Sequence, residues 1–305
     1  LRGRQHHRHS RLTMPHSSLY LRCAGRELHV LDWAPAHASP ARGTVVAWHG
    51  LARTGRDMDE LAAHLSARGW RVLCPDTIGR GLSQWAQSPR EEYCLAFYAR
   101  LARELLQQLG VERCHWVGTS MGGAIGTVGA SGYFEPELAR RIQSLVLNDN
   151  APELAQPAIE RIKAYASQPP AFATVSELEA FFRAAYQPYG FLTDAQWRRL
   201  AETSTRRLPD GRVTSHYDPA IVGQFTHHPD DYRIWHHYDA LKLPVLLLRG
   251  AESDLVLRQT AEQMRARGPG ARGQLQWVEV PGCGHAPALN VAEQLNLVSD
   301  FIERA

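Results

Sequence analysis

The sequence lacks the long hydrophobic runs, the charge bias and the paired cysteines that mark several large classes of protein. No apolar run approaches the roughly 18 residues of a membrane span. Lysine and arginine number 34 against 31 aspartates and glutamates, so the net charge is only +3. The sequence also has no basic stripe that alternates with aromatic residues, as nucleic-acid binding would favour. The five cysteines are scattered and form no C-x-x-C pair, which favours reduced thiols. We therefore expect a cytoplasmic protein that binds neither membranes nor nucleic acid.

The first 13 residues contain no acidic residue and no apolar segment, so they do not form a secretory signal. They are rich in arginine and histidine, and an ordinary globular sequence begins at Met14. We interpret residues 1–13 as a disordered or expression-derived N-terminus. The histidine clusters along the chain have no set of carboxylate or cysteine ligands beside them, so no metal site is expected.

What the sequence does contain is an alternation of short apolar runs with segments of helical periodicity. Two strands at residues 19–22 and 27–33 are joined by turn residues. Further strands, of the kind that is buried on both faces, are expected at 44–48, 71–74, 114–117, 144–147, 245–249 and 275–280. Apolar residues recur at helical spacing between them. This order predicts an α/β fold with a mainly parallel central sheet flanked by helices.

One long segment, residues 151–240, interrupts the alternation. It holds helical patterns at 158–166, 175–186 and 194–203 and no clear strand. Since a bare loop of this length is uncommon, we expect a helical cap over the carboxyl edge of the sheet, with residues 14–150 and 241–305 as the core. Most aromatic side chains of the cap are expected to form its own core. The candidates for substrate contact are Phe181, Tyr186 and Trp197.

A serine between glycines lies directly after the strand predicted at 114–117. Residues 118–122 read Gly-Thr-Ser-Met-Gly, which matches G-x-S-x-G between a strand and a helix. Side chains two positions before or after Ser120 would collide with the neighbouring strand or helix, which explains the glycines. A flexible turn without chemistry is the alternative. The strand before and the helix after favour Ser120 as a nucleophile.

A serine nucleophile needs a base, and the base needs an acid that orients it. After such an elbow the expected chain order is serine, then aspartate or glutamate, then histidine. His285 lies in a glycine-rich loop after the last strand and is the candidate base. Asp254, just past the strand 245–249, is the candidate acid, with Glu252 and Asp149 as alternatives.

A tetrahedral intermediate also needs hydrogen-bond donors for its oxyanion. The backbone N–H of Met121, at the start of the helix after the nucleophile, is one candidate. The second is the backbone N–H of Leu51, because Gly50 lets the chain turn after the strand 44–48. His49 is interpreted as a structural hydrogen-bonding residue.

Two arginines follow this turn. Arg53 and Arg56 are expected near the mouth of the site, where they could attract a carboxylate of the substrate. A salt link, such as Arg56 with Asp57 or Asp59, explains them equally well. Both interpretations stay open at this point, and Arg53 is retained as a candidate for substrate binding.

Together these motifs resemble the α/β-hydrolases over residues 19–305, in the capped subgroup of bacterial serine esterases, enol-lactonases and C–C bond hydrolases. The matching positions are His49-Gly50, the D-x-x-G-x-G-x-S turn at 76–83, residues 118–122, Asp254 and Gly284-His285. Haloalkane dehalogenases and epoxide hydrolases of this fold have an aspartate nucleophile, so the serine disfavours both. The turn after His49 also lacks the H-G-x-G-P-G pattern of the C–C hydrolases.

The motifs and the resemblance imply an esterase that needs no cofactor and works through an acyl-enzyme. Its partner would be a small-molecule ester, and the chain would be a monomer or a homodimer. The aromatic cap indicates short or medium apolar acyl esters, hydroxyacid oligomers or lactones. The alternatives are a C–C bond hydrolase of ring-cleavage products and a ligand-sensing receptor with slow turnover.

Overall fold

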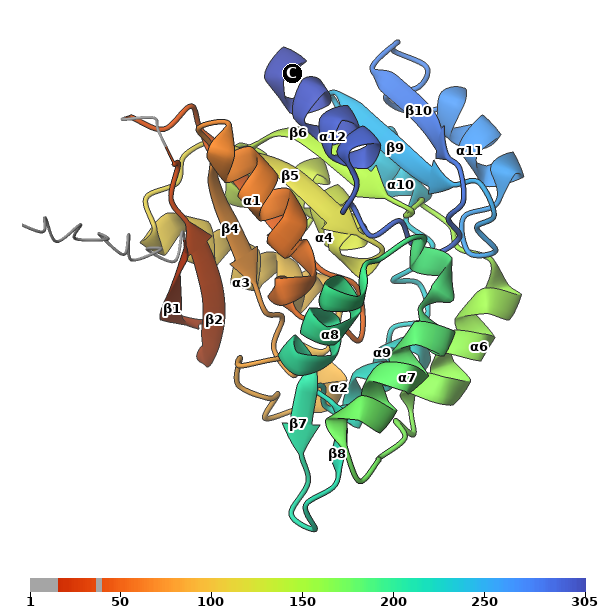
Figure 1. The fold of residues 1–305 in the computed structure, drawn as a ribbon. Coiled ribbons are helices and arrows are strands. Elements are labelled where there is room, and N and C mark those ends of the chain that lie inside the picture. The colour runs from red at the N-terminus through yellow and green to blue at the C-terminus, as the bar shows by residue number, and fades with distance from the viewer. Residues whose placement is uncertain (1–15, 37–39) are drawn as a thin grey trace, which may run out of the picture.

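An eight-stranded sheet forms the centre of the molecule in the computed structural model, which describes residues 16–36 and 40–305 (Figure 1). The predicted N-terminal extension 1–13 lies outside these residues. The strands lie in the order β1-β2-β4-β3-β5-β6-β9-β10. Their bounds are β1 His16–Cys23, β2 Arg26–Trp33, β3 Thr44–Trp48, β4 Arg71–Pro75, β5 Cys114–Thr119, β6 Ile142–Asn148, β9 Val245–Gly250 and β10 Leu275–Val280. Strand β2 is antiparallel to β1 and β4, and the other neighbours are parallel. The predicted fold class is confirmed.

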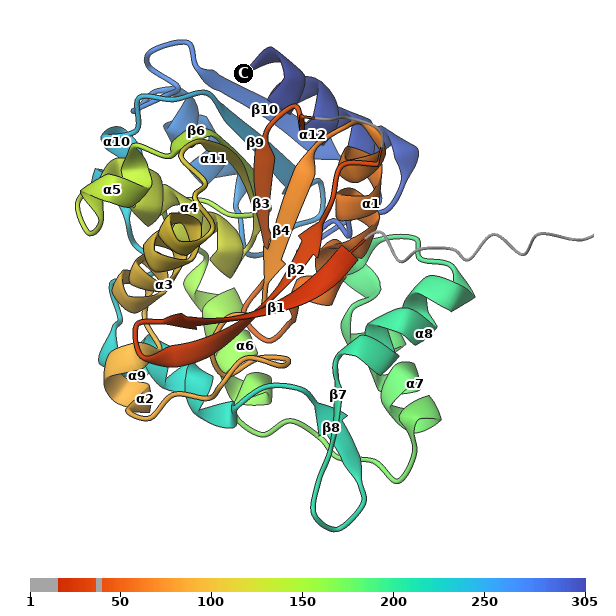
Figure 2. The same ribbon diagram turned by 90° about the vertical axis from the view of Figure 1, so that its left-hand side faces the viewer.

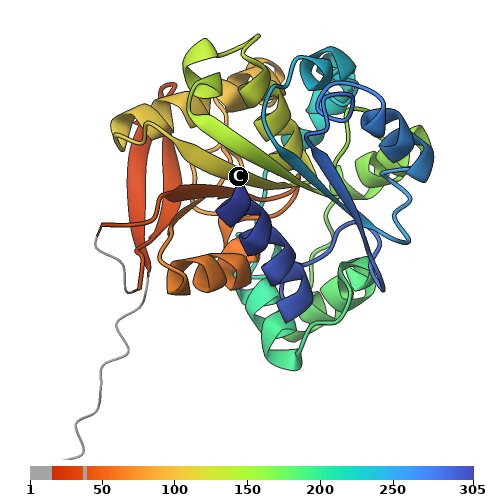
Figure 3. The ribbon, with the colours of Figure 1, turned by 90° about the horizontal axis from the view of Figure 1, so that it is seen from above.

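Helices cover both faces of the sheet because its central strands are apolar on both sides (Figure 3). In β3, Val45 and Ala47 face the helices α1 (Asp59–Ala67) and α12 (Ala292–Arg304). The alternate residues Val46 and Trp48 belong to the core under α3 (Leu95–Gln108), α4 (Met121–Ser131) and α11 (Arg258–Arg265). The part of the chain outside the segment 151–240 also contains two short helices, α2 (Pro89–Glu92) and α5 (Pro136–Ala139).

The segment 151–240 projects from the carboxyl ends of the strands (Figure 2). It contains α6 (Gln156–Ala166), α7 (Val175–Ala185), α8 (Asp194–Thr203), α9 (Gly223–His227) and α10 (Trp235–Asp239). A small core inside this segment includes Leu178, Phe182, Trp197 and Val213. Other parts join the main core: α10 packs against α4, and its Tyr238 is fully buried there. The domain boundaries at 150 and 240 stay a prediction.

The expectation that the segment 151–240 has no strand is wrong. A two-stranded antiparallel ribbon, β7 (Thr205–Arg207) and β8 (Val213–Ser215), extends from the end of α8. Each strand has three residues, which is too short for an alternating pattern to be visible in the sequence.

All five cysteines are buried and free of disulfides. Across residues 16–36 and 40–305, no helix has the length and apolar character that crossing a membrane requires.

Candidate active site

A cavity of about 360 Å³ lies between the carboxyl edge of the sheet and the cap. From the core, it is lined by the turn after β3, by Ser120 after β5 and by the loop after β10 that carries His285. From the cap, Tyr165 of α6 and the segment around Tyr186 close it. Because the carboxyl ends of parallel strands meet at one edge of a sheet, residues distant in sequence converge here.

Ser120 occupies a strained turn between β5 and α4. Its backbone has φ 50° and ψ −115°, which is rare for a residue with a side chain. A Cβ on Gly118 would lie 2.2 Å from the carbonyl oxygen of Gly122, and a Cβ on Gly122 would lie 2.2 Å from that of Trp48. The two glycines are therefore needed for steric reasons, as the nucleophile-elbow interpretation requires.

His285 is held by a buried carboxylate, and that carboxylate belongs to Asp149. The Nδ1 atom of His285 lies 2.6 Å from Oδ2 of Asp149, whose side chain has no exposed surface. Asp149 also accepts hydrogen bonds from the Gly250 N–H at 2.8 Å and the Ser253 hydroxyl at 2.7 Å. Since an ionised carboxylate only accepts, the imidazole proton is assigned to Nδ1, which leaves Nε2 as an acceptor.

The prediction that Asp254 orients His285 is wrong. Asp254 lies at the cavity mouth with its side chain 54% exposed, and it forms an ion pair with Arg161 of α6. The turn after β9 directs Ser253 inward to Asp149 and leaves its neighbours Glu252 and Asp254 exposed. Both aspartates follow a strand at the same sheet edge, and the sequence does not show which of the two side chains faces the histidine loop.

Ser120 and His285 line the same cavity. The Ser120 hydroxyl forms no side-chain hydrogen bond within the part of the chain that the structure describes. The histidine loop is fixed to both layers: the Gly284 N–H donates to the Pro188 carbonyl of the cap at 2.8 Å, and the loop passes close to Gly250 of the sheet. Serine and imidazole thus lie on separately fixed elements that line one cavity.

The two predicted oxyanion donors flank the serine. A Cβ on Gly50 would lie 3.8 Å from Cβ of Ser120, so the turn carrying Leu51 is adjacent to the nucleophile. Met121 is the first residue of α4, where backbone N–H groups have no partner inside the helix. Among the described residues, neither the Leu51 nor the Met121 N–H donates a backbone hydrogen bond. The oxyanion role of both stays a prediction.

Arg80, a fully buried residue of the D-x-x-G-x-G-x-S turn, has a part in the site that was not predicted from the sequence. Its Nε donates to the Leu51 carbonyl at 2.7 Å, and its Nη2 lies 3.3 Å from the sulfur of Met121. Nη1 donates to the Ile78 carbonyl and the Tyr98 hydroxyl, both at 2.9 Å. One guanidinium therefore contacts both predicted oxyanion residues. The sequence shows that this turn contains an arginine, but it does not show that the side chain is buried or what it contacts.

His49 is structural, as expected. Its Nδ1 lies 2.6 Å from the Gly50 carbonyl, and its Nε2 accepts from the Thr77 N–H at 2.9 Å. Complete burial lowers the pKa of His49 to about 4, so its ring is neutral at physiological pH. The ring fixes the turn that carries Leu51 and is not available as a second base.

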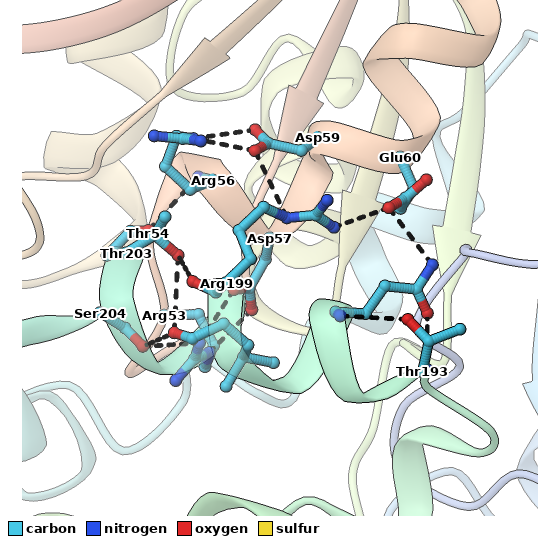
Figure 4. Close-up of polar contacts among 12 residues, drawn as sticks. Arg53, Thr54, Arg56, Asp57, Asp59, Glu60, Thr193, Arg199, Thr203 and Ser204 are labelled. Carbon is cyan, nitrogen blue, oxygen red and sulfur yellow. Dashed lines mark hydrogen bonds and ion pairs between the residues drawn. The ribbon is translucent and has the colours of Figure 1, made fainter. Parts of the chain in front are cut away.

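Of the four residues predicted to contact substrate, two line the cavity and two do not. Arg53 and Tyr186 lie in its wall. Phe181 and Trp197 instead pack in or against the small cap core, where α7 and α8 contact each other. Of the two salt links considered for Arg56, the one with Asp59 is present, whereas Asp57 pairs with Arg53 instead (Figure 4).

In the part of the chain that the structure describes, no group of three or more histidine, cysteine, aspartate or glutamate side chains is arranged to hold a metal ion.

Residues 43–290 match the family described as alpha/beta hydrolase fold. The chain belongs to the α/β-hydrolase family. A relative from Cupriavidus necator, named 3-hydroxybutyrate-oligomer hydrolase, is 37% identical over 270 residues, which are 86% of this chain and 88% of that protein. The expected class of enzyme, an ester hydrolase, is thereby confirmed.

Two solved structures are similar over nearly the whole chain. An α/β-hydrolase from Novosphingobium aromaticivorans is 31% identical, with a TM-score of 0.80 over 95% of this chain and 99% of that one. A protein from Rickettsia typhi described as a hydrolase is 22% identical, with a TM-score of 0.83 over 96% and 100%. The second likeness shows the shared fold alone.

Proposed function

We propose that this α/β-hydrolase cleaves carboxylic esters of small hydroxyacids through an acyl-enzyme formed on Ser120. The observation that carries the proposal is the contact between the buried Asp149 carboxylate and His285, which lines one cavity with a serine on a strained elbow. The similarity to the 3-hydroxybutyrate-oligomer hydrolase supports hydroxyacid oligomers as the substrate class. Short or medium apolar esters and lactones share the same reaction and fit the same proposal.

The proposed reaction follows from the positions of these groups. Ser120 Oγ attacks the ester carbonyl while His285 Nε2 takes its proton, and Asp149 stabilises the resulting imidazolium. The Leu51 and Met121 N–H groups donate to the oxyanion. His285 then gives its proton to the leaving alcohol, and a water activated by the same imidazole releases the acid from Ser120. Arg80 acts at a distance, by holding the carbonyl of Leu51.

The volume and lining of the cavity support small substrates. A volume of about 360 Å³ is near the lower end of ordinary ligand pockets. Its lining combines apolar surface with hydroxyl groups, from Ile162, Leu192 and Leu200 and from Tyr165, Tyr186 and Tyr189. This mixture suits a short chain that carries several ester oxygens.

Hydrolysis of p-nitrophenyl esters over a chain-length series tests the proposal. Wild type should release p-nitrophenol with a preference for short acyl chains, and Ser120→Ala should lower kcat by at least about 10³-fold. Ser88→Ala, an exposed serine without a side-chain cap hydrogen bond, is the control and should behave as wild type. Equal rates for wild type and Ser120→Ala, or cleavage of a dienoic keto-acid with no ester hydrolysis, would contradict it.

A further inference from the structure

A buried arginine in the cavity wall has hydrogen-bond donors without an acceptor. Arg53 is 3% exposed, and its Nε and Nη2 donate to Asp57 at 2.7 and 2.9 Å (Figure 4). Nη2 also donates to the Ser204 hydroxyl at 3.1 Å. Nη1 is buried and has no hydrogen-bond partner among the described residues. A buried unsatisfied donor on a charged group is costly, so an acceptor from outside the chain is expected here.

The side chain of Arg53 begins close to the nucleophile, and its guanidinium has a fixed orientation. A Cβ on Gly50 would lie 3.8 Å from Cβ of Ser120 and 3.9 Å from Cγ of Arg53, so both side chains adjoin Gly50. The guanidinium carbon lies 5.3 and 4.9 Å from the ring centres of Phe182 and Tyr186. With Asp57 on one edge and two aromatic rings packed against it, the group has little freedom to rotate.

The donors on Nη1 of Arg53 determine which chemical group of a ligand can bind there. Arginine has donors and no acceptor, and the hydroxyl groups of Tyr165 and Tyr189, also in the cavity lining, can add donors. An acceptor-only group complements such a site. Among acceptors, an ionised one forms hydrogen bonds about twice as strong as a neutral one does.

We propose that Arg53 Nη1 binds a free carboxylate of the substrate. The inference rests on the proposed ester hydrolysis and specifies its substrate: an ester with a free carboxylate close to the scissile bond, as at the acid end of a hydroxyacid oligomer. Because Arg53 and Ser120 both adjoin Gly50, the ester bond next to the terminal carboxylate is the one placed at the serine. Cleavage then releases one hydroxyacid at a time from that end.

The 3-hydroxybutyrate dimer, compared as free acid and as methyl ester, tests this proposal. The two compounds have the same inner ester bond and differ only at the terminal carboxylate. Because the methyl ester is itself hydrolysable, cleavage of its inner bond is followed by the initial rate of formation of methyl 3-hydroxybutyrate. Wild type should prefer the free acid in kcat/KM. Arg53→Met should lower kcat/KM for the acid about 10- to 100-fold, mainly through KM, and change the methyl ester less than about 3-fold. The acid-to-ester ratio is used because any misfolded fraction lowers both rates equally.

A second variant shifts the ratio in the opposite direction. Asp57→Asn keeps an acceptor oxygen for Arg53 but removes its counter-charge, so the acid-to-ester ratio should rise. The matched control is Arg71→Met. Arg71 makes the same two-bond fork, to Asp32 at 3.0 and 2.9 Å, but lies at the start of β4, at the sheet end away from the cavity. Its ratio should equal that of wild type.

Three results would overturn the proposal. One is a wild-type preference for the methyl ester. Another is an equal loss on both dimers in Arg53→Met, which would indicate a structural role or a neutral acceptor. The third is an unchanged ratio in both Arg53→Met and Asp57→Asn. In each case hydrolysis of p-nitrophenyl esters that depends on Ser120 would leave the proposed function standing, whereas no ester hydrolysis at all would remove both.

Discussion

Asp149 combines an unusual backbone with a fully partnered carboxylate. Its φ of 49° is strained for a residue other than glycine, and its side chain accepts from three groups on two other segments. The Gly250 N–H and the Ser253 hydroxyl fix both oxygens, so the carboxylate cannot rotate away from His285. A buried anion held in this way keeps the imidazole in one tautomer and balances its charge after proton transfer.

Replacing each aspartate by asparagine should therefore show which of the two carboxylates acts with His285. Asp149→Asn should lower kcat for ester hydrolysis by about 10³- to 10⁴-fold with little change in KM, because the amide no longer stabilises the imidazolium. Asp254→Asn should keep kcat within about 3-fold of wild type, since its side chain is half exposed and paired with Arg161. Steady-state kinetics on p-nitrophenyl acetate measure both. The reverse order of the two effects would restore Asp254 as the acid.

At the scale of elements, the position of the nucleophile depends on how closely α4 approaches β3. Gly122, in the first turn of α4, has no side chain, and this allows the Trp48 and His49 carbonyls to lie against the helix. The same approach sets Ser120 beside the turn that carries Leu51. Packing of one helix on one strand end thus determines the geometry of the serine and of both predicted oxyanion donors.

A methyl group added at Gly122 should disturb the contact between α4 and the end of β3. In Gly122→Ala the new Cβ would lie 2.2 Å from a backbone oxygen, so the free energy of unfolding should fall by about 3 kcal/mol and ester hydrolysis should be lost. Gly223→Ala is the control, because its Cβ would make an ordinary 3.4 Å contact at a φ of −57°. That variant should equal or slightly exceed wild type in stability. Urea unfolding gives both values, and a wild-type midpoint for Gly122→Ala would contradict the packing argument.

At the scale of the whole molecule, the core buries several histidines in their neutral form. Burial lowers the pKa of His49, His115 and His237 to about 4 each. In the unfolded chain these groups titrate near 6.5. Between pH 6.5 and 4 the unfolded state therefore binds more protons than the folded state does, and stability must fall as the pH falls through this window.

The expected result is a urea unfolding midpoint that is constant above pH 7 and decreases steadily from pH 6.5 to 4.5. His49 alone, which has no exposed surface, contributes a loss of about 3 kcal/mol over the full window. His115→Gln, whose amide can still bond to the Ser144 hydroxyl, should show a shallower dependence. A midpoint that does not change with pH in wild type would show that these rings are not buried neutral.

The sequence by itself determined the sheet, its flanking helices, the elbow at Ser120 and the loop of His285. These features are local: a strand buried on both faces needs a continuous apolar run, and a sharp strand-to-helix turn needs glycines at fixed spacing. Chain order and resemblance then identified the family. Short features such as β7 and β8 escaped because three residues cannot show a period.

The tertiary structure decided between Asp149 and Asp254, removed Phe181 and Trp197 from the cavity wall, and revealed the contacts of Arg80 and Arg53. Each of these depends on the direction of a side chain between elements distant in sequence. The order of residues fixes which strand an aspartate follows. Only the packing of the loops after β6, β9 and β10 against one another fixes which carboxylate is buried against the imidazole.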